Sequence, residues 1–505
     1  MIAAADLPDD IDALKAMIVA QGEQNARLET LVAALRKALF GRKSEKVDPD
    51  QFELALEDIE TGIAQIEAEG ETNPLVTPTR TSAPRQSNRG SLPKHLPRIE
   101  EVIEPDSTIC GCGSERHVIG EDISERLDIV PAQFRVIVTR RPKYACRSCE
   151  EGIVQAPAPA HLIPGGMPTE AAIAHVIVSK YADHTPLYRQ AQIYARQGIV
   201  LDRSTLAAWV GRAAFELRPV YDALMADLKR STKLFMDETV APVLDPGRKK
   251  TKTGYFWALA RDDRPWSGDD PPGVAFTYAP GRAGEYAKQI LEGFNGTLQV
   301  DGYAGYNRLL KRQEGSIRLA HCWAHARRKL FDVAKAGKAT PIADEGIAQI
   351  QALYRIEKEI RGQSPATRNA VRQERSKPTI DQMEFWLRET RSRVSAKSPI
   401  GEALSYIAKH WEGLTMFLDD GRVELDSNSV ERTIRPIALN RKNALFAGHD
   451  VGAQNWAILA SMIETCKLNG IDPHAWLTQT LTAIARGHKQ SQINDLLPWN
   501  HSAQV

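Results

Sequence analysis

Apolar residues near the N-terminus recur in alternating steps of three and four, which is the spacing of a heptad seam. The seam runs from Ile11 to Leu39 and is interrupted by Gln21 and Asn25. Asn25 falls on an a-type position, where a polar residue fixes register and strand number at some cost in stability. The pattern predicts either a short parallel coiled coil, and with it a homo-oligomer, or an amphipathic helix packed on its own chain. Both interpretations stay open.

Beyond the seam the chain becomes basic and then loses its apolar periodicity. Arg42, Lys43 and Lys46 follow the seam directly, and no acidic residue occurs from Pro78 to Arg98. A segment rich in Pro, Ser, Thr and Arg cannot bury a core, so we expect a flexible basic linker suited to phosphate contacts. The three basic residues are candidate DNA contacts, although a solvated helix end would have the same composition.

Four of the six cysteines form two close pairs, Cys110-x-Cys112 and Cys146-x-x-Cys149. Two such pairs on turns joined by a β-hairpin are typical of a zinc ribbon, because four thiolates can enclose a tetrahedral ion. We therefore predict a zinc-ribbon-like β module with these four ligands. The C-x-C pair leaves little room for the backbone turn that wraps the metal, so a ribbon that holds no zinc is the alternative.

A helical pattern follows the cysteines and ends before the next change of periodicity. Within it, a helix, a turn at Gly198 and a second helix capped by Asp202 or Ser204 have helix-turn-helix spacing. Plain helical packing is an equally common cause of this pattern. The candidate DNA-reading residues at the start of the second helix are Arg203, Ser204 and Thr205.

Alternating apolar and polar positions then predict three strands, a helix and a fourth strand, which match the opening of an RNase H-like sheet. Asp237 lies inside the first strand, and Asp301 directly follows the fourth. These strands are neighbours in such a sheet, so we expect the two carboxylates to meet. A strand-end aspartate often only caps a turn. However, an interior carboxylate is costly to desolvate unless a metal compensates. Glu238 alternates to the opposite face and is disfavoured as a ligand.

A third carboxylate is expected from a later helix, and three candidates lie within eight residues: Glu424, Asp426 and Glu431. Asp426 stands where a short acceptor caps the helix. Glu431 lies in the first turns, with Arg435 one turn on and on the same face. Asn428-x-x-Glu431 also fits a capping box, which is the competing interpretation. We choose Glu431 as the third ligand.

Together, Asp237, Asp301 and Glu431 are predicted to hold two divalent cations, Mg²⁺ or Mn²⁺. Cleavage and transfer of DNA strands need two hard cations, one to activate the attacking oxygen and one to stabilise the leaving oxygen. Carboxylates must therefore converge from separate elements, as these three would.

Several motifs, in the same order along nearly the whole chain, resemble transposases of the insertion sequence 66 family. They are LFGRKSEK, HVIGEDISERLDIVPAQFRVIVTRRPKYACRSC, FMDET, VDGYAGYN, HCWAHARRKLF, NSVERTIRPIALNRKNALFAG and CKLNGIDP. The resemblance implies an RNase H-like DDE domain with Asp237, Asp301 and Glu431 at the matching positions. It also implies a helical insertion and two small accessory proteins encoded by the same element. The short Cys110-Gly-Cys112 departs from the family's longer cysteine stretch.

The HCWAH stretch, with His321, Cys322 and His325, suggests a metal motif. We interpret it instead as a strand-to-helix junction beside the catalytic site, where His325 or Arg327 contacts DNA phosphate. Further candidate DNA contacts are Arg435 and Lys442.

These patterns predict an α+β multidomain protein of the following ranges: a coiled-coil or helical region (1–69), a basic linker (70–99), a zinc-ribbon-like domain (100–160), a helix-turn-helix domain (161–230), a first catalytic part (231–323), a helical insertion (324–426), final catalytic helices (427–470) and a C-terminal helical element (471–505). The net charge of +1 gives no global sign of nucleic-acid binding, so the case for DNA rests on local segments. The chain has no apolar run of about eighteen residues, and its N-terminus is acidic, which favours a cytoplasmic protein without membrane contact.

We therefore expect a transposase that binds terminal inverted repeats, nicks the ends and joins the 3′ strands to target DNA. Two alternatives are a non-catalytic DNA-binding regulator and an RNase H-like nuclease without strand transfer.

Overall fold

The computed structural model describes residues 133–145, 153–245, 250–311, 317–336, 341–444 and 446–501. The chain divides into two units, one of Ala83–Ala156 and one of Met1–Ser82 with Pro157–Val505. In the first unit, Lys143–Ala145 (β1) and Ile153–Gln155 (β2) form an antiparallel pair. The predicted coiled coil, the basic linker, the basic residues after the seam and the four paired cysteines lie outside the described residues.

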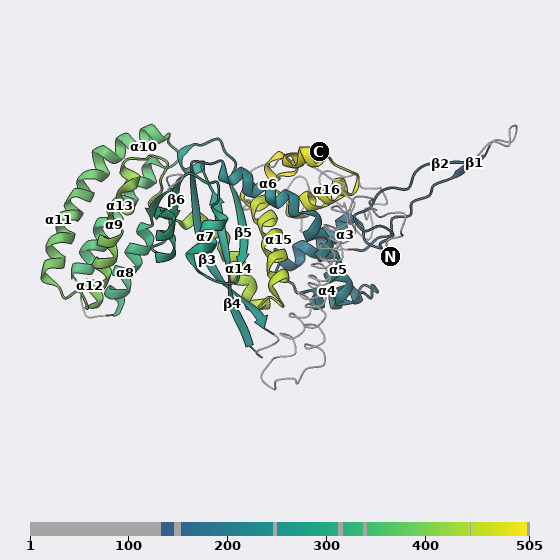
Figure 1. Cartoon of the computed structure of the whole chain (residues 1–505), viewed down its shortest axis with the longest axis horizontal. Helices are drawn as coiled ribbons and strands as arrows, with labels where there is room; N and C mark the ends of the chain where they lie inside the picture. Colours follow the sequence, from purple (N-terminus) through teal and green to yellow (C-terminus); the bar gives the residue numbers. More distant parts are fainter. Residues whose placement is uncertain are drawn as a thin grey trace, which may run out of the picture. The chain divides into compact units, whose positions relative to one another are not determined.

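The second unit contains a five-stranded mixed sheet (Figure 1), in the order β5-β4-β3-β6-β7. Strands β3, β4 and β5 are antiparallel, whereas β6 runs parallel to β3 and β7 parallel to β6. The predicted sequence of three strands, a helix and a fourth strand is confirmed. The elements are Lys233–Asp245 (β3), Lys250–Arg261 (β4), Gly273–Ala279 (β5), Gly284–Ile290 (α7), Gly296–Val300 (β6) and Ile317–His321 (β7).

The start of β6 is held against the chain that leads into β3. Gly296 has a φ of +142°, and a Cβ there would lie 2.2 Å from the carbonyl oxygen of Thr232, so only glycine fits this position. The next residue, Thr297, donates its N–H to that same oxygen at 2.9 Å. The parallel register that follows places Phe235 opposite Gln299.

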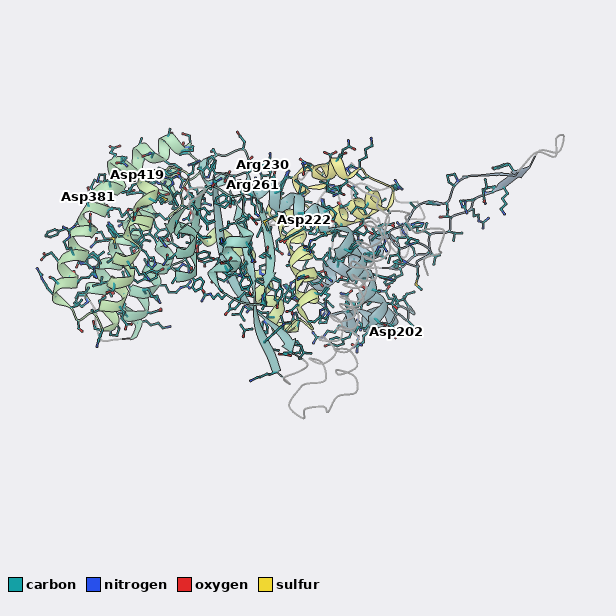
Figure 2. All side chains as sticks on the ribbon, in the orientation of Figure 1. Asp202, Asp222, Arg230, Arg261, Asp381 and Asp419 are labelled. Carbon is teal, nitrogen blue, oxygen red and sulfur yellow. The ribbon has the colours of Figure 1, made fainter. Side chains whose placement is uncertain are left out.

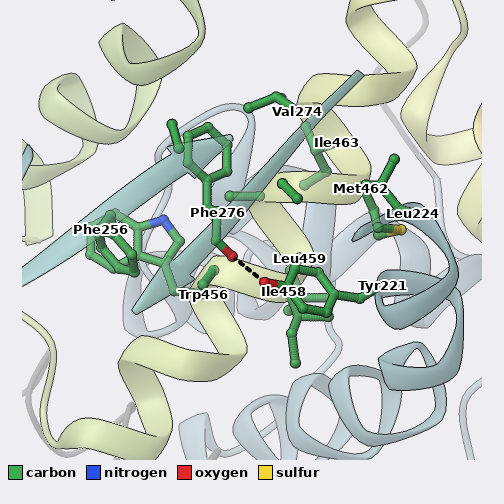
Figure 3. Packing of buried hydrophobic residues seen from close by; sticks show 14 of the residues in the cluster. Tyr221, Leu224, Phe256, Val274, Phe276, Trp456, Ile458, Leu459, Met462 and Ile463 are labelled. Atoms are coloured by element: carbon green, nitrogen blue, oxygen red, sulfur yellow. Dashed lines mark hydrogen bonds between the residues drawn. The ribbon is translucent and has the colours of Figure 1, made fainter. Parts of the chain in front are cut away.

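The long helix Asp450–Leu468 (α15) packs on the edge strand β5 and is buried along most of its length (Figures 1 and 3). Ser461 Oγ accepts the N–H of Phe276 at 2.8 Å. Thr465 Oγ1 accepts the N–H of Val274 at 3.1 Å and donates to its carbonyl at 3.0 Å. Unpaired backbone groups on an edge strand are costly when buried and invite pairing with other chains. The two helix hydroxyls satisfy these groups and close this edge.

Helices before and after the sheet share one hydrophobic core with it. On α6, the hydroxyl of Tyr221 donates to the carbonyl of Phe276 at 2.9 Å (Figure 3), and α3 contacts both α15 and α16. The ranges predicted as separate helical domains are therefore joined to the sheet by continuous packing, while their boundaries stay predictions. None of the described helices is long and apolar enough to cross a membrane. The helices are Glu170–Tyr181 (α3), Leu187–Ala195 (α4), Arg203–Glu216 (α5), Arg218–Lys229 (α6) and Pro473–Ala485 (α16).

A buried ion pair also joins α6 to β4. Arg261 is 2% exposed, and its Nη2 donates to Asp227 Oδ2 on α6 at 2.8 Å. Its Nε donates to the carbonyl of Pro271 at 2.9 Å, and Figure 2 shows Arg261 beside Arg230, where α6 ends. These bonds satisfy a charge that would be costly to bury alone.

The insertion between β7 and the last helices of the sheet forms a second hydrophobic cluster. Its helices gather on one side of the sheet in Figure 1. A short π-helix, Arg372–Ser376, joins two of them. The helices are Trp323–Ala336 (α8), Pro341–Ile360 (α9), Pro365–Val371 (α10), Lys377–Arg393 (α11), Pro399–Lys409 (α12) and Trp411–Thr415 (α13), and Asn428–Ala444 (α14) follows them.

Two buried arginines hold the segment that leads from the insertion back to the sheet. Arg372 is fully buried and makes a bidentate pair with Glu357, with both Nε–Oε1 and Nη2–Oε2 at 2.7 Å. Its Nη2 also donates to the carbonyl of Val423 at 2.9 Å. Arg368, 1% exposed, donates to Glu424 at 2.6 Å. The segment is thus fixed by charge-assisted bonds rather than by apolar packing alone.

Thr465→Val and Ser461→Ala should each lower the free energy of unfolding by about 1–3 kcal/mol, because each leaves backbone groups of β5 without a partner. Thr478→Val is the matched control, since the hydroxyl of Thr478 donates only to the carbonyl of His474 within its own helix. Denaturant titration measures the differences. Equal stabilities of the Thr465 and Thr478 variants would show that β5 does not depend on these hydroxyls.

Arg372→Met should cost about 3–5 kcal/mol of stability, because it removes the bidentate partner of Glu357 and leaves that largely buried carboxylate with the single bond from Arg368 at 3.1 Å. Arg375→Met is the control: Arg375 pairs with Glu359 on the surface, where both side chains are about half exposed, so little change is expected. Thermal unfolding of both variants compares the two pairs. A loss no larger in the Arg372 variant than in the Arg375 variant would contradict the anchoring role.

Candidate active site

The strand register brings the first two predicted carboxylates together. Asp237 lies two residues beyond Phe235 in β3, and Asp301 lies two residues beyond Gln299, directly after β6. Because Phe235 pairs with Gln299 in a parallel register, its continuation places Asp237 opposite Asp301. Both carboxylates therefore stand at the same edge of the sheet, as the sequence predicts.

Burial raises the pKa of Asp237 to about 7, and the negative charges of Glu238, Asp301 and Glu431 act in the same direction. A hydrogen bond from the N–H of Glu238 to Asp237 Oδ1, at 2.8 Å, partly offsets this rise. Asp301 and Glu431 thus lie near enough to Asp237 for their charges to act on its carboxyl. A divalent cation would offset these negative charges.

Asp301 is held by the turn that follows it. Its Oδ1 accepts the N–H of Tyr303 at 2.8 Å, so this aspartate does cap a turn while facing the site. Gly302 lies between these two residues, and its N–H donates to the hydroxyl of Tyr406. A Cβ at position 302 would lie 2.4 Å from that oxygen. Helix α12 of the insertion therefore packs directly against the loop that carries Asp301.

Glu238, which strand alternation disfavours as a ligand, is bound by an arginine and a tyrosine. Its side chain is 1% exposed, with Arg282 Nε at 2.5 Å from Oε1 and the hydroxyl of Tyr306 at 2.6 Å from Oε2. The guanidinium of Arg282 also lies 3.9 Å from the centroid of the Tyr303 ring. Sequence reasoning missed this network. The only local sequence signal for the network is the pair Tyr303 and Tyr306, which follows Asp301.

Glu431, in the first turn of α14, faces the junction between β7 and α8. Its Oε1 lies 3.8 Å from Nδ1 of His325 and accepts a hydrogen bond from Ser427 Oγ at 3.3 Å. Ligand atoms of Cys322, His325 and Glu431 all lie within 4.8 Å of one another, so these three side chains could hold a metal ion. Cys322 was not among the predicted ligands.

The HCWAH stretch is the predicted strand-to-helix junction, because β7 ends at His321 and α8 begins at Trp323. The ring of His321 packs against that of His410 in the insertion, with centroids 4.6 Å apart. His321 is therefore directed toward the insertion, whereas His325 faces Glu431.

A buried glutamine ties the segment before α14 to the sheet. Gln299 Nε2 donates to the carbonyls of Glu424 at 2.6 Å and Asp426 at 3.1 Å, and its Oε1 accepts the N–H of Glu424 at 3.2 Å. The N–H of Trp323 donates to the carbonyl of Leu425 at 2.8 Å. These bonds set the start of α14, and with it Glu431, relative to Asp301. The sequence signal for this role is that Gln299 is a polar residue within the apolar run of β6.

The two competing carboxylates have other partners. Glu424 is paired with Arg368 at 2.6 Å and with Arg361 at 3.4 Å. Asp426 Oδ1 accepts the N–H of Asn428 at 3.1 Å, which confirms its predicted capping role. It also accepts the hydroxyl of Tyr354.

The capping box that competed for Glu431 is not formed through the backbone. The N–H of Asn428, which the capping box would pair with Glu431, donates to Asp426 Oδ1 at 3.1 Å, and the N–H of Ser427 donates to Cys322 Sγ at 3.3 Å. Glu431 reaches back only to the serine hydroxyl. Its second carboxylate oxygen has no hydrogen-bond partner in the described part of the chain.

The predicted helix-turn-helix elements are present, with α4, a turn at Gly198 of φ +78° and α5. Asp202 occupies the N-cap position of α5 (Figure 2) without a side-chain cap bond. The candidate DNA contacts occur on three helices: Arg203, Ser204 and Thr205 open α5, Arg327 lies in α8, and Arg435 and Lys442 lie in α14. Their contacts with DNA stay predictions.

Four sequence families match the chain in succession. The family described as "Transposase IS66 family" matches residues 165–455, and the "IS66 C-terminal element" matches residues 461–499. Residues 27–100 match "Transposase C of IS166 homeodomain", and residues 107–150, which contain the paired cysteines, match "zinc-finger binding domain of transposase IS66".

Relatives of nearly the same length occur in Sinorhizobium fredii. "Uncharacterized protein y4qI" is 44% identical, covering 98% of each chain, and "Uncharacterized protein y4jD" is 46% identical, covering 98% of this chain and 97% of its own. A chain of the "Drosophila P element transposase strand transfer complex" aligns at a TM-score of 0.32 and 10% identity, over 59% of this chain and 92% of that one. A similarity of this size carries no structural argument.

The family match covers more than half of the chain and the relatives cover nearly all of it. The chain belongs to the IS66 family of transposases, and with it to the enzymes that act on DNA.

Proposed function

We propose that the protein binds the terminal inverted repeats of its insertion sequence, nicks the ends and transfers the 3′ strands to target DNA. The reaction would take place at Asp237, Asp301 and Glu431. The observation that supports this most is that burial raises the pKa of Asp237 to about 7 and that the charges of Asp301 and Glu431 act on the same carboxyl in the same direction. The strand order β5-β4-β3-β6-β7 is the one expected of an RNase H-like sheet.

The donor set suits hard divalent cations. Carboxylate oxygens are the ligands that Mg²⁺ and Mn²⁺ favour. Two such ions would activate the attacking oxygen and stabilise the leaving one. Asp237 and Asp301 each use Oδ1 to accept a neighbouring backbone N–H, which orients each carboxylate and leaves Oδ2 for a ligand. Glu431 approaches from α14, so the three donors come from three separate elements.

The remaining candidate residues would hold the DNA. Residues at the start of α5 would enter the major groove, as in other helix-turn-helix proteins. His325 and Arg327 on α8, with Arg435 and Lys442 on α14, would contact phosphates near the cut. Arg42, Lys43 and Lys46 would contribute further phosphate contacts, and the ribbon cysteines would bind Zn²⁺. Dimerisation through the N-terminal seam and help from accessory proteins belong to the same proposal.

Two other functions would give different products. A regulator without catalysis would bind the element's ends and never cut them. A nuclease without strand transfer would cut the ends but not join them. Labelled DNA ends incubated with Mg²⁺ or Mn²⁺ and target DNA, separated on a denaturing gel, distinguish uncut, cut and joined strands.

Asp237→Asn, Asp301→Asn and Glu431→Gln should each reduce 3′ nicking of labelled ends by orders of magnitude, because each removes charge that a cation needs. Binding of the same ends should change little. Asp426→Asn is the matched control, since asparagine preserves the helix cap. An active Glu431→Gln enzyme beside an inactive Asp426→Asn enzyme would place the third ligand at Asp426.

Metal-free protein should lose stability as the pH rises from about 4 to about 7. The folded state holds the proton of Asp237 up to a pKa of about 7, whereas an unfolded aspartate releases it near 3.8. Asp237→Asn should therefore melt above the wild type at pH 8 and equal it near pH 4. Mg²⁺ should raise the Tm of the wild type more than that of the variant. A wild-type Tm unaffected by Mg²⁺ at pH 8 would contradict the metal assignment.

A further inference from the structure

A cavity of about 450 Å³ opens between α8, α9 and the start of α14. One face of α8 contributes Arg327, Arg328 and Phe331, and the opposite wall includes Gln351, Tyr354 and Asn428. Pockets that bind small organic groups have volumes of roughly 300–1,000 Å³. The cavity is therefore large enough for one nucleotide and too small for a DNA duplex.

The cavity adjoins the third carboxylate of the candidate site. Asn428 lies one turn before Glu431 on α14. On α8, His325 precedes Arg327 by two residues and lies 3.8 Å from Glu431. The hydroxyl of Tyr354 donates to Asp426 in the segment that leads into α14. A group bound in the cavity would thus lie within one helical turn of the proposed point of cleavage.

The lining combines positive charge with exposed aromatic surface. Among the residues that the structure describes, no carboxylate forms an ion pair with Arg327 or Arg328. Phe331 is 46% exposed, and the guanidinium of Arg327 lies 5.8 Å from its ring centroid. Arginine pairs with phosphate in bidentate fashion, and aromatic rings stack on nucleobases.

We propose that this cavity binds one unpaired nucleotide of the DNA beside the cleavage point. Its base would stack on Phe331, and its phosphate would pair with Arg327 and Arg328. The amides of Gln351 and Asn428 would meet the edge of the base. Removing a base from the duplex costs stacking energy, which a stacking platform returns. The inference rests on the proposed function, because it presumes that DNA reaches Glu431.

A photocrosslinking experiment tests the contact directly. The probe is a DNA duplex with a single-stranded 3′ overhang that carries 5-iodo-2′-deoxyuridine, incubated with full-length Asp237→Asn protein so that the strand is not cut. Irradiation joins this base to an aromatic ring stacked against it, and mass spectrometry locates the bond. We expect the crosslink at Phe331 or Tyr354. Phe385, 67% exposed on α11, is the internal control and should not react.

Affinity measurements test how much the stack on Phe331 contributes to DNA binding. Phe331→Ala should weaken binding of the overhang duplex by roughly 5- to 150-fold, the range expected for losing one base–aromatic stack, and leave binding of the blunt duplex unchanged. Phe385→Ala should change neither. Both substitutions are at exposed sites, so an equal Tm in the two variants verifies that folding is intact.

The outcomes separate this inference from the proposed function. Binding of blunt duplex with a crosslink outside the cavity, or with no loss in Phe331→Ala, overturns the nucleotide site and leaves the transposase mechanism standing. Failure to bind either duplex, even those carrying the element's own ends, contradicts the proposed function itself. A cavity that binds an acidic peptide but not the overhang would also overturn the inference.

Discussion

The parallel pairing of β6 with β3 is the constraint on which the candidate site depends. Gly296 allows β6 to begin against the carbonyl of Thr232, and the register that follows brings Asp301 opposite Asp237. Burial raises the pKa of Asp237, and the charges of Asp301 and Glu431 add to this cost. Contacts outside the site hold these carboxylates together against that cost.

Much of that holding comes from the helical insertion. Gln299 and Arg368 fix Glu424 through its backbone and its side chain, so the segment before α14 cannot move away from β6. Tyr406 on α12 packs against Gly302, next to the second aspartate. The insertion is therefore part of the structure that positions the carboxylates. Changes in the packing of the insertion should therefore shift the carboxylates of the candidate site. The cavity in the insertion lies beside Glu431 and so adjoins this site.

Local sequence patterns were sufficient to predict that Asp237 and Asp301 stand at the same sheet edge, because alternation marks the strands and neighbouring strands share an edge. Glu431, chosen as the third ligand among three candidates, stays a prediction. Glu424 is paired with Arg368, and Asp426 is bonded to Tyr354. Both partners lie in other helices, far from these carboxylates along the chain. The same holds for Gln299, whose contact with Glu424 spans 125 residues. No periodicity encodes such contacts. The seam and the ribbon, outside the described residues, stay predictions.

The most direct test of the central claim is a crystal structure of the full-length protein with Mn²⁺, in which anomalous scattering locates the ions. The account predicts two Mn²⁺ ions among the carboxylates of Asp237, Asp301 and Glu431, with Glu424 still paired to Arg368. Mn²⁺ bound through Glu424 or Asp426 instead, or absent from Asp237 and Asp301 at saturating concentration, would contradict it.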